Sequence, residues 1–301
     1  MQLDPSDLDA ASRHLMPESA LPLIRFMAHQ SLGAQAVEAP AEVWRQATGL
    51  GWIDVQTGAR TALGTLISDS CREYMFWKER GGALPFKDSL PHLALATFQG
   101  KYVAEIGAGM GANLMSLSGT AERLCGVEPV AAYVQLGRIL RAREGIEDVE
   151  IRPGGAEALP FEDGELDLVL CVTAHQYFDL HTALPEIARV TRPGGELIIL
   201  GGTLGQYAAD FGLQVLRSGG RRMREYVMTL VNTLGYQAVG RRLLLSRGAF
   251  STSRPIYPSV GFMTRHLEAA GFETLAEPQR AAGEHCFYVR RRKTGRRLRD
   301  G

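Results

Sequence analysis

The sequence of 301 residues predicts an α/β protein with a doubly wound, mostly parallel sheet. Between residues 98 and 200, apolar segments rich in Val, Ile and Leu alternate with segments of helical periodicity. The apolar segments show almost no alternation of polar and apolar residues, which is typical of strands covered on both faces by helices. Turn sequences at 162–165 (EDGE) and 192–196 (RPGGE) separate these elements. The alternating order of strands and helices favours right-handed crossover connections between parallel strands.

Strands and helices are expected to follow one another through this region. The expected strands are 101–107, 123–129, 149–154, 165–173 and 195–202, and the expected helices are 112–119, 131–145 and 181–191. A helix at 259–271 and strands at 272–278 and 284–292 then bring the sheet to seven strands. We therefore expect a core at 98–203 that is completed by 258–292.

The first 97 residues have a different pattern. Helices are expected at 21–32, 40–51 and 62–80, with a short hairpin at 51–61. Helices followed by a two-stranded wing resemble a winged-helix module. We expect residues 1–97 to be a mainly helical, winged-helix-like domain that forms a homodimer and closes over the site.

Two other segments lie outside the core. Residues 204–257 are expected to be a helical cap inserted after the fifth strand, which sets substrate specificity. Its arginines would either receive an acidic substrate or lie on a solvated helix face. Residues 293–301 form a basic tail that we expect to be disordered.

Composition narrows the classes of protein. The 33 basic residues balance 33 acidic ones, which argues against an overall polyanion binder. The four cysteines have no CxxC or CxxH spacing, so we expect free buried thiols, no metal site and a reducing cytoplasmic compartment. We expect no signal segment and no membrane span, because no apolar run approaches about 20 residues.

The strongest ligand signal is EIGAGMG at 105–111, where a strand turns into a helix. Glycines at such a turn let a ligand approach the main chain, and the helix start offers unpaired N–H groups. Glu128 ends the next strand, where a carboxylate can accept both ribose hydroxyls. Packing alone accounts for one or two of the glycines and leaves Glu105 and Glu128 unexplained. The pattern predicts a site for an adenosine-like ligand.

The charge of this loop bears on which ligand it binds. The dinucleotide fingerprint is GxGxxG, with a pyrophosphate at the helix start, whereas the spacing here is GxGxG and Glu105 precedes it. A carboxylate in that place would repel a pyrophosphate but would attract a cation. The charge logic therefore favours S-adenosylmethionine, which carries an ammonium and a sulfonium, over a nicotinamide dinucleotide.

Four segments in order resemble the motifs of class I S-adenosylmethionine-dependent methyltransferases, closest to the branch with the ubiquinone/menaquinone-biosynthesis enzymes. They are EIGAGMG (105–111), GVEPV (126–130), the run from 154 to 178 and LPEIARVTRPGGELII (184–199). The resemblance covers about residues 98–203. It implies a Rossmann-like fold, S-adenosylmethionine as the methyl donor and S-adenosylhomocysteine as the product.

The resemblance also implies roles for individual residues. The methionine moiety would be held by Glu105 and the backbone of Gly107, Ala108 and Gly109, and the ribose hydroxyls by Glu128. The adenine would lie against Pro129, with Ala156 and Glu157 at its edge. The family often has an acidic residue where Gly155 stands, so Glu157 or main-chain groups must compensate here.

The segment after the fourth strand, 172–179, is expected beside the transferred methyl group, because ligands bind at the carboxyl ends of the strands. His175 is the candidate base for an acceptor O–H or N–H, and Tyr177 would orient the acceptor. A packing role for His175 stays open, since alignment alone can accelerate an in-line displacement. Trp77 would either fold over cofactor or substrate, or fill a domain junction.

The leading hypothesis is a methyltransferase that acts on a small-molecule metabolite, at O or N rather than C. An RNA methyltransferase that uses the basic tail is an alternative, although the charge balance makes a nucleic-acid partner a weaker hypothesis. The other alternative is a non-enzymatic regulator that senses S-adenosylmethionine and binds DNA. Its would-be recognition helix at 40–51 carries a single arginine, which is poor for phosphate contacts.

Overall fold

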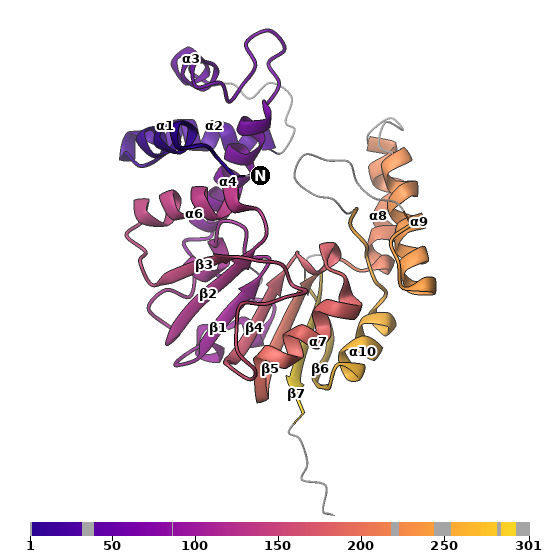
Figure 1. The fold of residues 1–301 in the computed structure, drawn as a ribbon. Helices are drawn as coiled ribbons and strands as arrows, with labels where there is room; N and C mark the ends of the chain where they lie inside the picture. The colour runs from indigo at the N-terminus through magenta and orange to yellow at the C-terminus, as the bar shows by residue number, and fades with distance from the viewer. Residues whose placement is uncertain are drawn as a thin grey trace, which may run out of the picture.

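A single seven-stranded sheet with the order β3-β2-β1-β4-β5-β7-β6 organises the computed structural model (Figure 1). Strands β1 to β5 are parallel, and β7 is antiparallel to both β5 and β6. The expected doubly wound, mostly parallel sheet is thus confirmed. The strands are β1 (Tyr102–Ile106), β2 (Arg123–Glu128), β3 (Val149–Pro153), β4 (Leu166–Val172), β5 (Thr191–Gly201), β6 (Phe272–Ala281) and β7 (Glu284–Arg291).

The structure describes residues 2–31, 39–85, 87–217, 223–243, 254–281 and 284–292. The basic tail at 293–301, expected to be disordered, lies outside these ranges. The α-helices are α1 (Pro5–Leu15), α2 (Leu21–Ser31), α3 (Ala41–Gly49), α4 (Ala62–Glu79), α5 (Ala112–Met115), α6 (Ala131–Arg143), α7 (Leu180–Val190), α8 (Leu204–Arg217), α9 (Met223–Val239) and α10 (Val260–Ala269).

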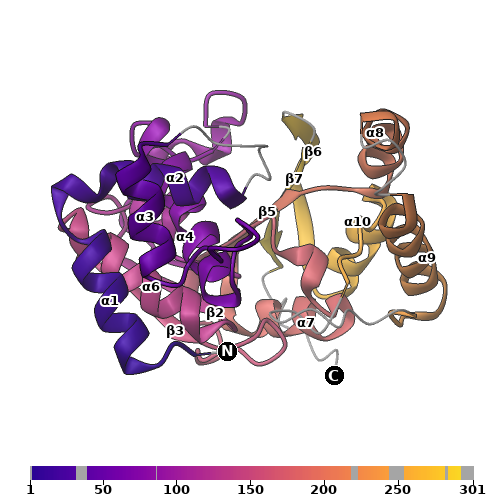
Figure 2. The same cartoon turned by 90° about the horizontal axis from the view of Figure 1, so that it is seen from above.

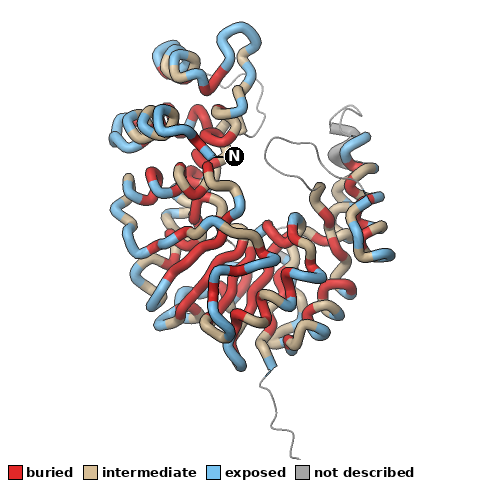
Figure 3. The backbone as a smooth tube through the Cα atoms, viewed as in Figure 1, coloured by how far each residue is buried: buried red, intermediate tan, exposed pale blue. Residues whose placement is uncertain are grey.

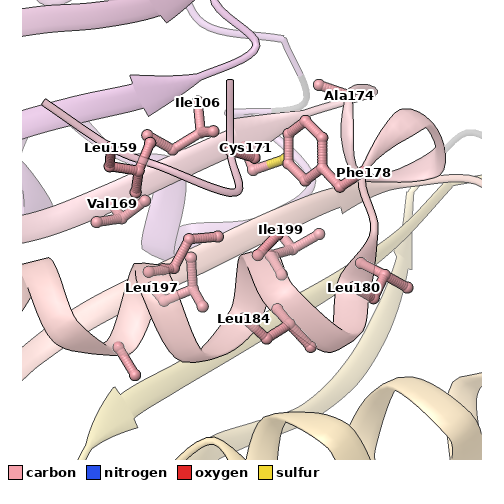
Figure 4. Packing of buried hydrophobic residues seen from close by; sticks show 14 of the residues in the cluster. Ile106, Leu159, Val169, Cys171, Ala174, Phe178, Leu180, Leu184, Leu197 and Ile199 are labelled. Carbon is pink, nitrogen blue, oxygen red and sulfur yellow. The ribbon is translucent and has the colours of Figure 1, made fainter. Parts of the chain in front are cut away.

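Alternate residues of the central strands enter two different hydrophobic layers. Ala104 and Ile106 of β1 pack with α7 and α10, whereas Val103 packs on the opposite face with the segment that precedes β1. Figure 4 shows the first layer, in which the Phe178 ring lies beside Cys171 and above the sheet. Burial on both faces explains why the strands read as continuous apolar runs (Figure 3).

The order of the strands places a switch point at β1. Its two neighbours are β2 and β4, so the chain winds outward in opposite directions from this strand. The carboxyl ends of β1, β2, β4 and β5 therefore meet at one edge of the sheet, which is the ligand-binding edge of such folds.

The N-terminal helices share a hydrophobic cluster with the core. Apolar side chains of α1 to α4 pack with those of α5 and α6, and Met110 of the glycine loop belongs to the same cluster. Figures 1 and 2 show these helices grouped beside α6, while α8 and α9 lie on the other side of the molecule. The N-terminal helices are thus packed directly against the element that supports the glycine loop.

Some boundaries differ from the sequence-based expectation. Helix α1 was not expected, although Asp4 caps it and Pro5 occupies its first turn, both ordinary start signals. The expected hairpin at 51–61 is present as one antiparallel bridge, between Ile53 and Arg60. Strand β5 begins at Thr191, the last residue of the expected helix, and runs through the expected turn at 192–196. Helix α5 is shorter than the expected 112–119 helix.

All four cysteines are free and buried, as expected. Within the described parts of the chain, no helix combines the length and the apolar character needed to cross a lipid bilayer.

Helix α4 packs against the segment that contains the Ile53–Arg60 bridge, and this contact is possible because Gly64 has no side chain. A Cβ at Gly64 would lie 1.7 Å from the Trp52 carbonyl oxygen, so Gly64→Ala forces the two segments apart. We expect a loss of about 1–3 kcal/mol in the free energy of unfolding, measured by urea denaturation. Gly49→Ala, at an exposed helix end with nothing within 4 Å, is the control and should cost nothing. Equal stability of the two variants would contradict this packing.

Candidate functional site

The loop after β1 turns on three glycines with positive φ. These angles are 75° at Gly107, 55° at Gly109 and 94° at Gly111, which starts α5. A Cβ at Gly107 would lie 2.3 Å from that of Ala174, and one at Gly109 would lie 2.6 Å from Glu73 Oε2. The glycines therefore satisfy both the backbone conformation and the close approach of neighbouring segments.

Two more glycines let this loop sit deeply in the fold. A Cβ at Gly126 of β2 would be 2.6 Å from the Ala108 Cβ, and one at Gly137 of α6 would be 2.3 Å from the Met110 carbonyl oxygen. The same carbonyl accepts a hydrogen bond of 2.6 Å from Nη1 of the buried Arg141. Contacts with β2 and α6 thus fix the position of the loop.

Glu128, at the end of β2, is tied to this loop. Its Oε2 accepts from the Gly109 N–H at 3.0 Å, and its Oε1 accepts from the Val130 N–H at 2.9 Å. Burial raises the pKa of the carboxyl, and the two backbone hydrogen bonds oppose that rise. A carboxylate offers about four acceptor positions, so each oxygen keeps capacity for a ligand hydroxyl.

Glu105, the last but one residue of β1, is the most buried acid of the site, with 1% of its surface exposed. Its Oε1 accepts from Asn113 Nδ2 at 2.7 Å, and its buried Oε2 has no hydrogen-bond partner. Burial raises the pKa of Glu105 to about 8, and the nearby Glu73 and Glu128 add to the rise. A buried acceptor without a donor fits a cationic ligand group.

A third carboxylate comes from the N-terminal region and was missed by the sequence analysis. Glu73 of α4 accepts from the Met110 N–H at 3.2 Å through Oε2. Glu73 as a whole is half-buried, but the loss of water around its carboxyl raises the pKa to about 7, and the Met110 hydrogen bond counteracts part of the rise. The only sign of Glu73 in the sequence is an acidic residue within an apolar stretch of the expected helix at 62–80.

The two segments expected around an adenine are joined by a hydrogen bond of 3.2 Å from the Gly154 N–H to the Glu128 carbonyl. Pro129 is exposed directly after Glu128, and Ala156 is buried. Glu157 Oε1 accepts from the Asp179 N–H at 2.8 Å, and its Oε2 lies 3.1 Å from the position of a Cβ on Gly155. The carboxylate of Glu157 thus stands next to the place where the family often has an acidic side chain.

The turn after β4 is held in an unusual conformation. Thr173 has a φ of 51°, the one positive value among the non-glycine residues that the structure describes. Its N–H donates to the Leu200 carbonyl at 2.7 Å, which fixes the turn against β5. Because such strain gathers at functional sites, Thr173 marks this turn as part of the site.

His175 follows this turn and is fully buried. Neither ring nitrogen has a partner in good hydrogen-bond geometry, although the Gly202 backbone is close enough to raise the pKa of the ring and oppose the effect of burial. A Cβ at Gly201 would be 2.4 Å from the ring Cε1. Burial lowers the pKa of His175 to about 4, so the ring is neutral at pH 7. The ring therefore has a free acceptor nitrogen but little basicity in the ligand-free protein.

The two aromatic candidates lie in different surroundings. Tyr177 is 46% exposed and is close enough to influence the pKa of Tyr257. Trp77 packs against the N-terminal cluster, and its ring is 3.4 Å from the position of a Cβ on Gly82. No hydrogen bond or ring contact within the described residues joins Trp77 to His175 or Tyr177. Tyr177 thus shares the short helical turn of His175, whereas Trp77 belongs to the N-terminal cluster.

The expected cap contributes an aromatic cluster that the sequence analysis did not find. The rings of Tyr207 and Tyr257 stack with centroids 4.4 Å apart, and Tyr226 lies 5.1 Å from Tyr207. A Cβ at Gly202 would be 2.9 Å from the Tyr257 ring and 3.7 Å from Glu284 Oε2, a buried oxygen without a partner. The cluster therefore adjoins the end of β5.

The arginines of the cap do not form one basic surface. Arg242 donates to the Gln176 carbonyl at 3.2 Å and to the Phe178 carbonyl, so it supports the His175 turn. Arg224 and Arg241 are exposed, while the side chain of Arg217 and both Arg221 and Arg222 lie outside the described residues.

Comparison with known proteins identifies the central part of the chain. Residues 104–199 match the family model described as a methyltransferase domain. An uncharacterized methyltransferase of Bacillus subtilis, YcgJ, is 31% identical over 99 residues, which are 33% of this chain and 39% of the relative. A fatty-acid O-methyltransferase of Mycolicibacterium smegmatis is 37% identical over 109 residues, 34% of this chain and 37% of the relative.

These matches are local, because they span less than two fifths of the length of both relatives. Among solved structures, a SAM-dependent methyltransferase of Methanosarcina mazei is similar, with 13% identity, a TM-score of 0.48 and coverage of 66% of this chain and 97% of that one. The fold assignment itself rests on the sheet order. Residues 104–199 thus match a methyltransferase domain, a family that uses S-adenosylmethionine as its methyl donor.

The raised pKa of Glu105 has a consequence for stability. The unfolded chain releases this proton near pH 4.5, whereas the folded chain keeps it until about pH 8, so stability is lost as the pH rises through that window. We expect the free energy of unfolding of the wild type to fall from about pH 5 to 8. Glu105→Gln, which keeps the acceptor for Asn113, should fall less steeply, whereas the exposed Glu122→Gln should match the wild type. If the free energy of unfolding fell equally with pH in all three proteins, the raised pKa of Glu105 would be ruled out.

Proposed function

We propose that this chain is an S-adenosylmethionine-dependent methyltransferase that transfers a methyl group to a small-molecule acceptor. The observation that carries the proposal is the unpaired Oε2 of Glu105, buried under the glycine loop at the switch point of the sheet. Such an acceptor calls for a cation. The cofactor brings an ammonium, together with a sulfonium that makes its methyl group electrophilic.

The cofactor would lie across the ends of β1 and β2. We assign the methionine moiety to Glu105 and to the backbone of 107–109, and the ribose hydroxyls to Glu128. The exposed Pro129 and the buried Ala156 would flank the adenine. Glu157, beside Gly155, would supply the acidic edge that position 155 lacks. The three carboxylates around the loop disfavour a dinucleotide, because a pyrophosphate there would repel them in their ionised form.

The acceptor would lie between the turn after β4 and the aromatic cluster of the cap. Tyr177 is exposed on that side, and Tyr207, Tyr226 and Tyr257 offer an apolar surface with hydroxyl groups. Such a surface suits a small organic acceptor with an aromatic or apolar body and an attacking oxygen or nitrogen. We propose His175 as the residue that accepts the proton of this group, because its ring is neutral and unpaired.

The N-terminal helices pack on α6, and we propose that their outer surface forms a homodimer. The competing functions find less support. Of the basic run that would bind RNA, Arg290 pairs with Glu196 at 3.5 Å, and Arg291 donates to the backbone carbonyls of Arg189 in α7 and Thr191 in β5. For DNA binding, α3 offers the single arginine Arg45, which bonds to its own helix.

The role of Glu128 is tested by ligand binding. Glu128→Ala removes the acceptors for the ribose hydroxyls and the tie to Gly109, so S-adenosylhomocysteine should bind at least about tenfold more weakly, a loss of about 1.4 kcal/mol. Isothermal titration calorimetry measures both proteins, with the exposed Glu122→Ala as the control. An unchanged affinity of Glu128→Ala would remove this residue from the site.

The role of His175 is tested separately. His175→Leu removes two unpaired buried nitrogens, so the free energy of unfolding should rise by about 1 kcal/mol if the ring serves the reaction and not the fold. Binding of S-adenosylhomocysteine should stay the same, while methyl transfer to a panel of phenols and amines should fall by a factor of about 100 or more.

The opposite result for His175→Leu would contradict this role. A variant with reduced stability and normal transfer would show that His175 is a packing residue.

A further inference from the structure

Glu73 is placed over the glycine loop by a helix that belongs to the N-terminal region. Its Oε2 and Oε1 lie 2.6 and 3.1 Å from the position of a Cβ on Gly109. The Met110 N–H donates to the same Oε2. The carboxylate therefore contacts the two consecutive residues around which the methionine part of the cofactor would bind.

Helix α4 is held firmly in this position. One turn before Glu73, the Tyr133 hydroxyl of α6 donates to Asp69 Oδ2 at 3.2 Å. One turn after it, Lys78 forms an ion pair of 3.0 Å with Glu144, which also accepts from the Tyr74 hydroxyl. The ties on both sides of Glu73 fix its backbone relative to α6, which itself supports the loop.

The charges around Glu73 are mainly negative. On its own helix, Arg72 pairs with Asp69 at 3.2 Å. Glu128 faces it from β2, and from β1 Glu105 senses its charge. From α6, Tyr133 is within electrostatic range. The charge of Arg72 lowers the pKa of Glu73, but Glu73 forms no ion pair in the described part of the chain. This carboxylate therefore has a backbone donor and no directly paired cation.

We propose that Glu73 binds the ammonium group of the cofactor together with the unpaired Oε2 of Glu105, so that the N-terminal helix α4 forms part of the cofactor site. This inference rests on the proposed function. It adds a residue from outside the matched domain, 104–199, to the site. It also gives the N-terminal region a direct role in binding, besides its packing on α6.

The chemistry of the ammonium and of the two carboxylates, Glu73 and Glu105, agrees with this assignment. An ammonium has three N–H donors and needs several acceptors, which one oxygen of Glu105 cannot supply alone. Without a cation, burial raises the pKa of Glu73 to about 7 and that of Glu105 to about 8, so both carry protons for part of the time at neutral pH. A bound ammonium favours the ionised carboxylates, and the displaced protons pass to the buffer.

The experiment is calorimetric titration of the full chain with S-adenosylhomocysteine at pH 7, in phosphate and in Tris. The two buffers differ in ionisation enthalpy, so the difference in heat gives the number of protons released. We expect the wild type to release protons on binding. Glu73→Gln should bind about tenfold more weakly and release fewer protons. Gln mimics the protonated acid, so the fold should persist, and the exposed Glu79→Gln on the same helix is the matched control.

A second ligand separates binding from mere support of the loop. 5′-Methylthioadenosine lacks the amino-acid part, so it should bind equally to the wild type and to Glu73→Gln. Equal weakening of both ligands, or no change for either, would overturn the role of Glu73. If the wild type bound neither ligand, the proposed function itself would fail. Binding of both ligands by the wild type with no proton release would also contradict the shared ammonium site.

Discussion

Negative charge buried beneath the glycine loop is the constraint on which the functional interpretation depends. Glu105 and Glu128 end adjacent strands at the switch point, and Glu73 approaches the same loop from α4. Burying an acid without a cation is costly, and the charge of Glu128 raises the pKa of both Glu73 and Glu105. A fold that keeps such an arrangement gains from it when a positively charged ligand is bound. The methyl donor would place its ammonium at this loop, whereas a dinucleotide would place its anionic pyrophosphate there.

Close packing of backbone segments gives the loop its shape and links it to the rest of the protein. Glycines at 107, 126 and 137 each stand where a Cβ would collide with a neighbouring segment. The loop can therefore touch β2, α6 and the turn after β4 at once. That turn leads through His175 to Gly201, at the end of β5. The proposed cofactor and acceptor sites would thus share one continuous edge of the sheet.

The sequence was enough to predict the sheet, because apolar strands and turn residues are local signals. It also predicted Glu105, Glu128 and the glycines, which stand in one short motif and at the end of the next strand. Glu73, Glu284 and the tyrosines of the cap could not be found in this way, because contacts between segments far apart in the chain give them their roles. The burial of His175 is likewise a property of its packing against Gly201.

The central claim is that the charge of the loop selects the ligand. The most direct measurement is calorimetric titration of the wild-type protein with S-adenosylhomocysteine and, under the same conditions, with NAD. We expect micromolar binding of S-adenosylhomocysteine and no detectable binding of NAD. Binding of NAD with equal or greater affinity would contradict it, because a pyrophosphate would then be accepted beside three carboxylates.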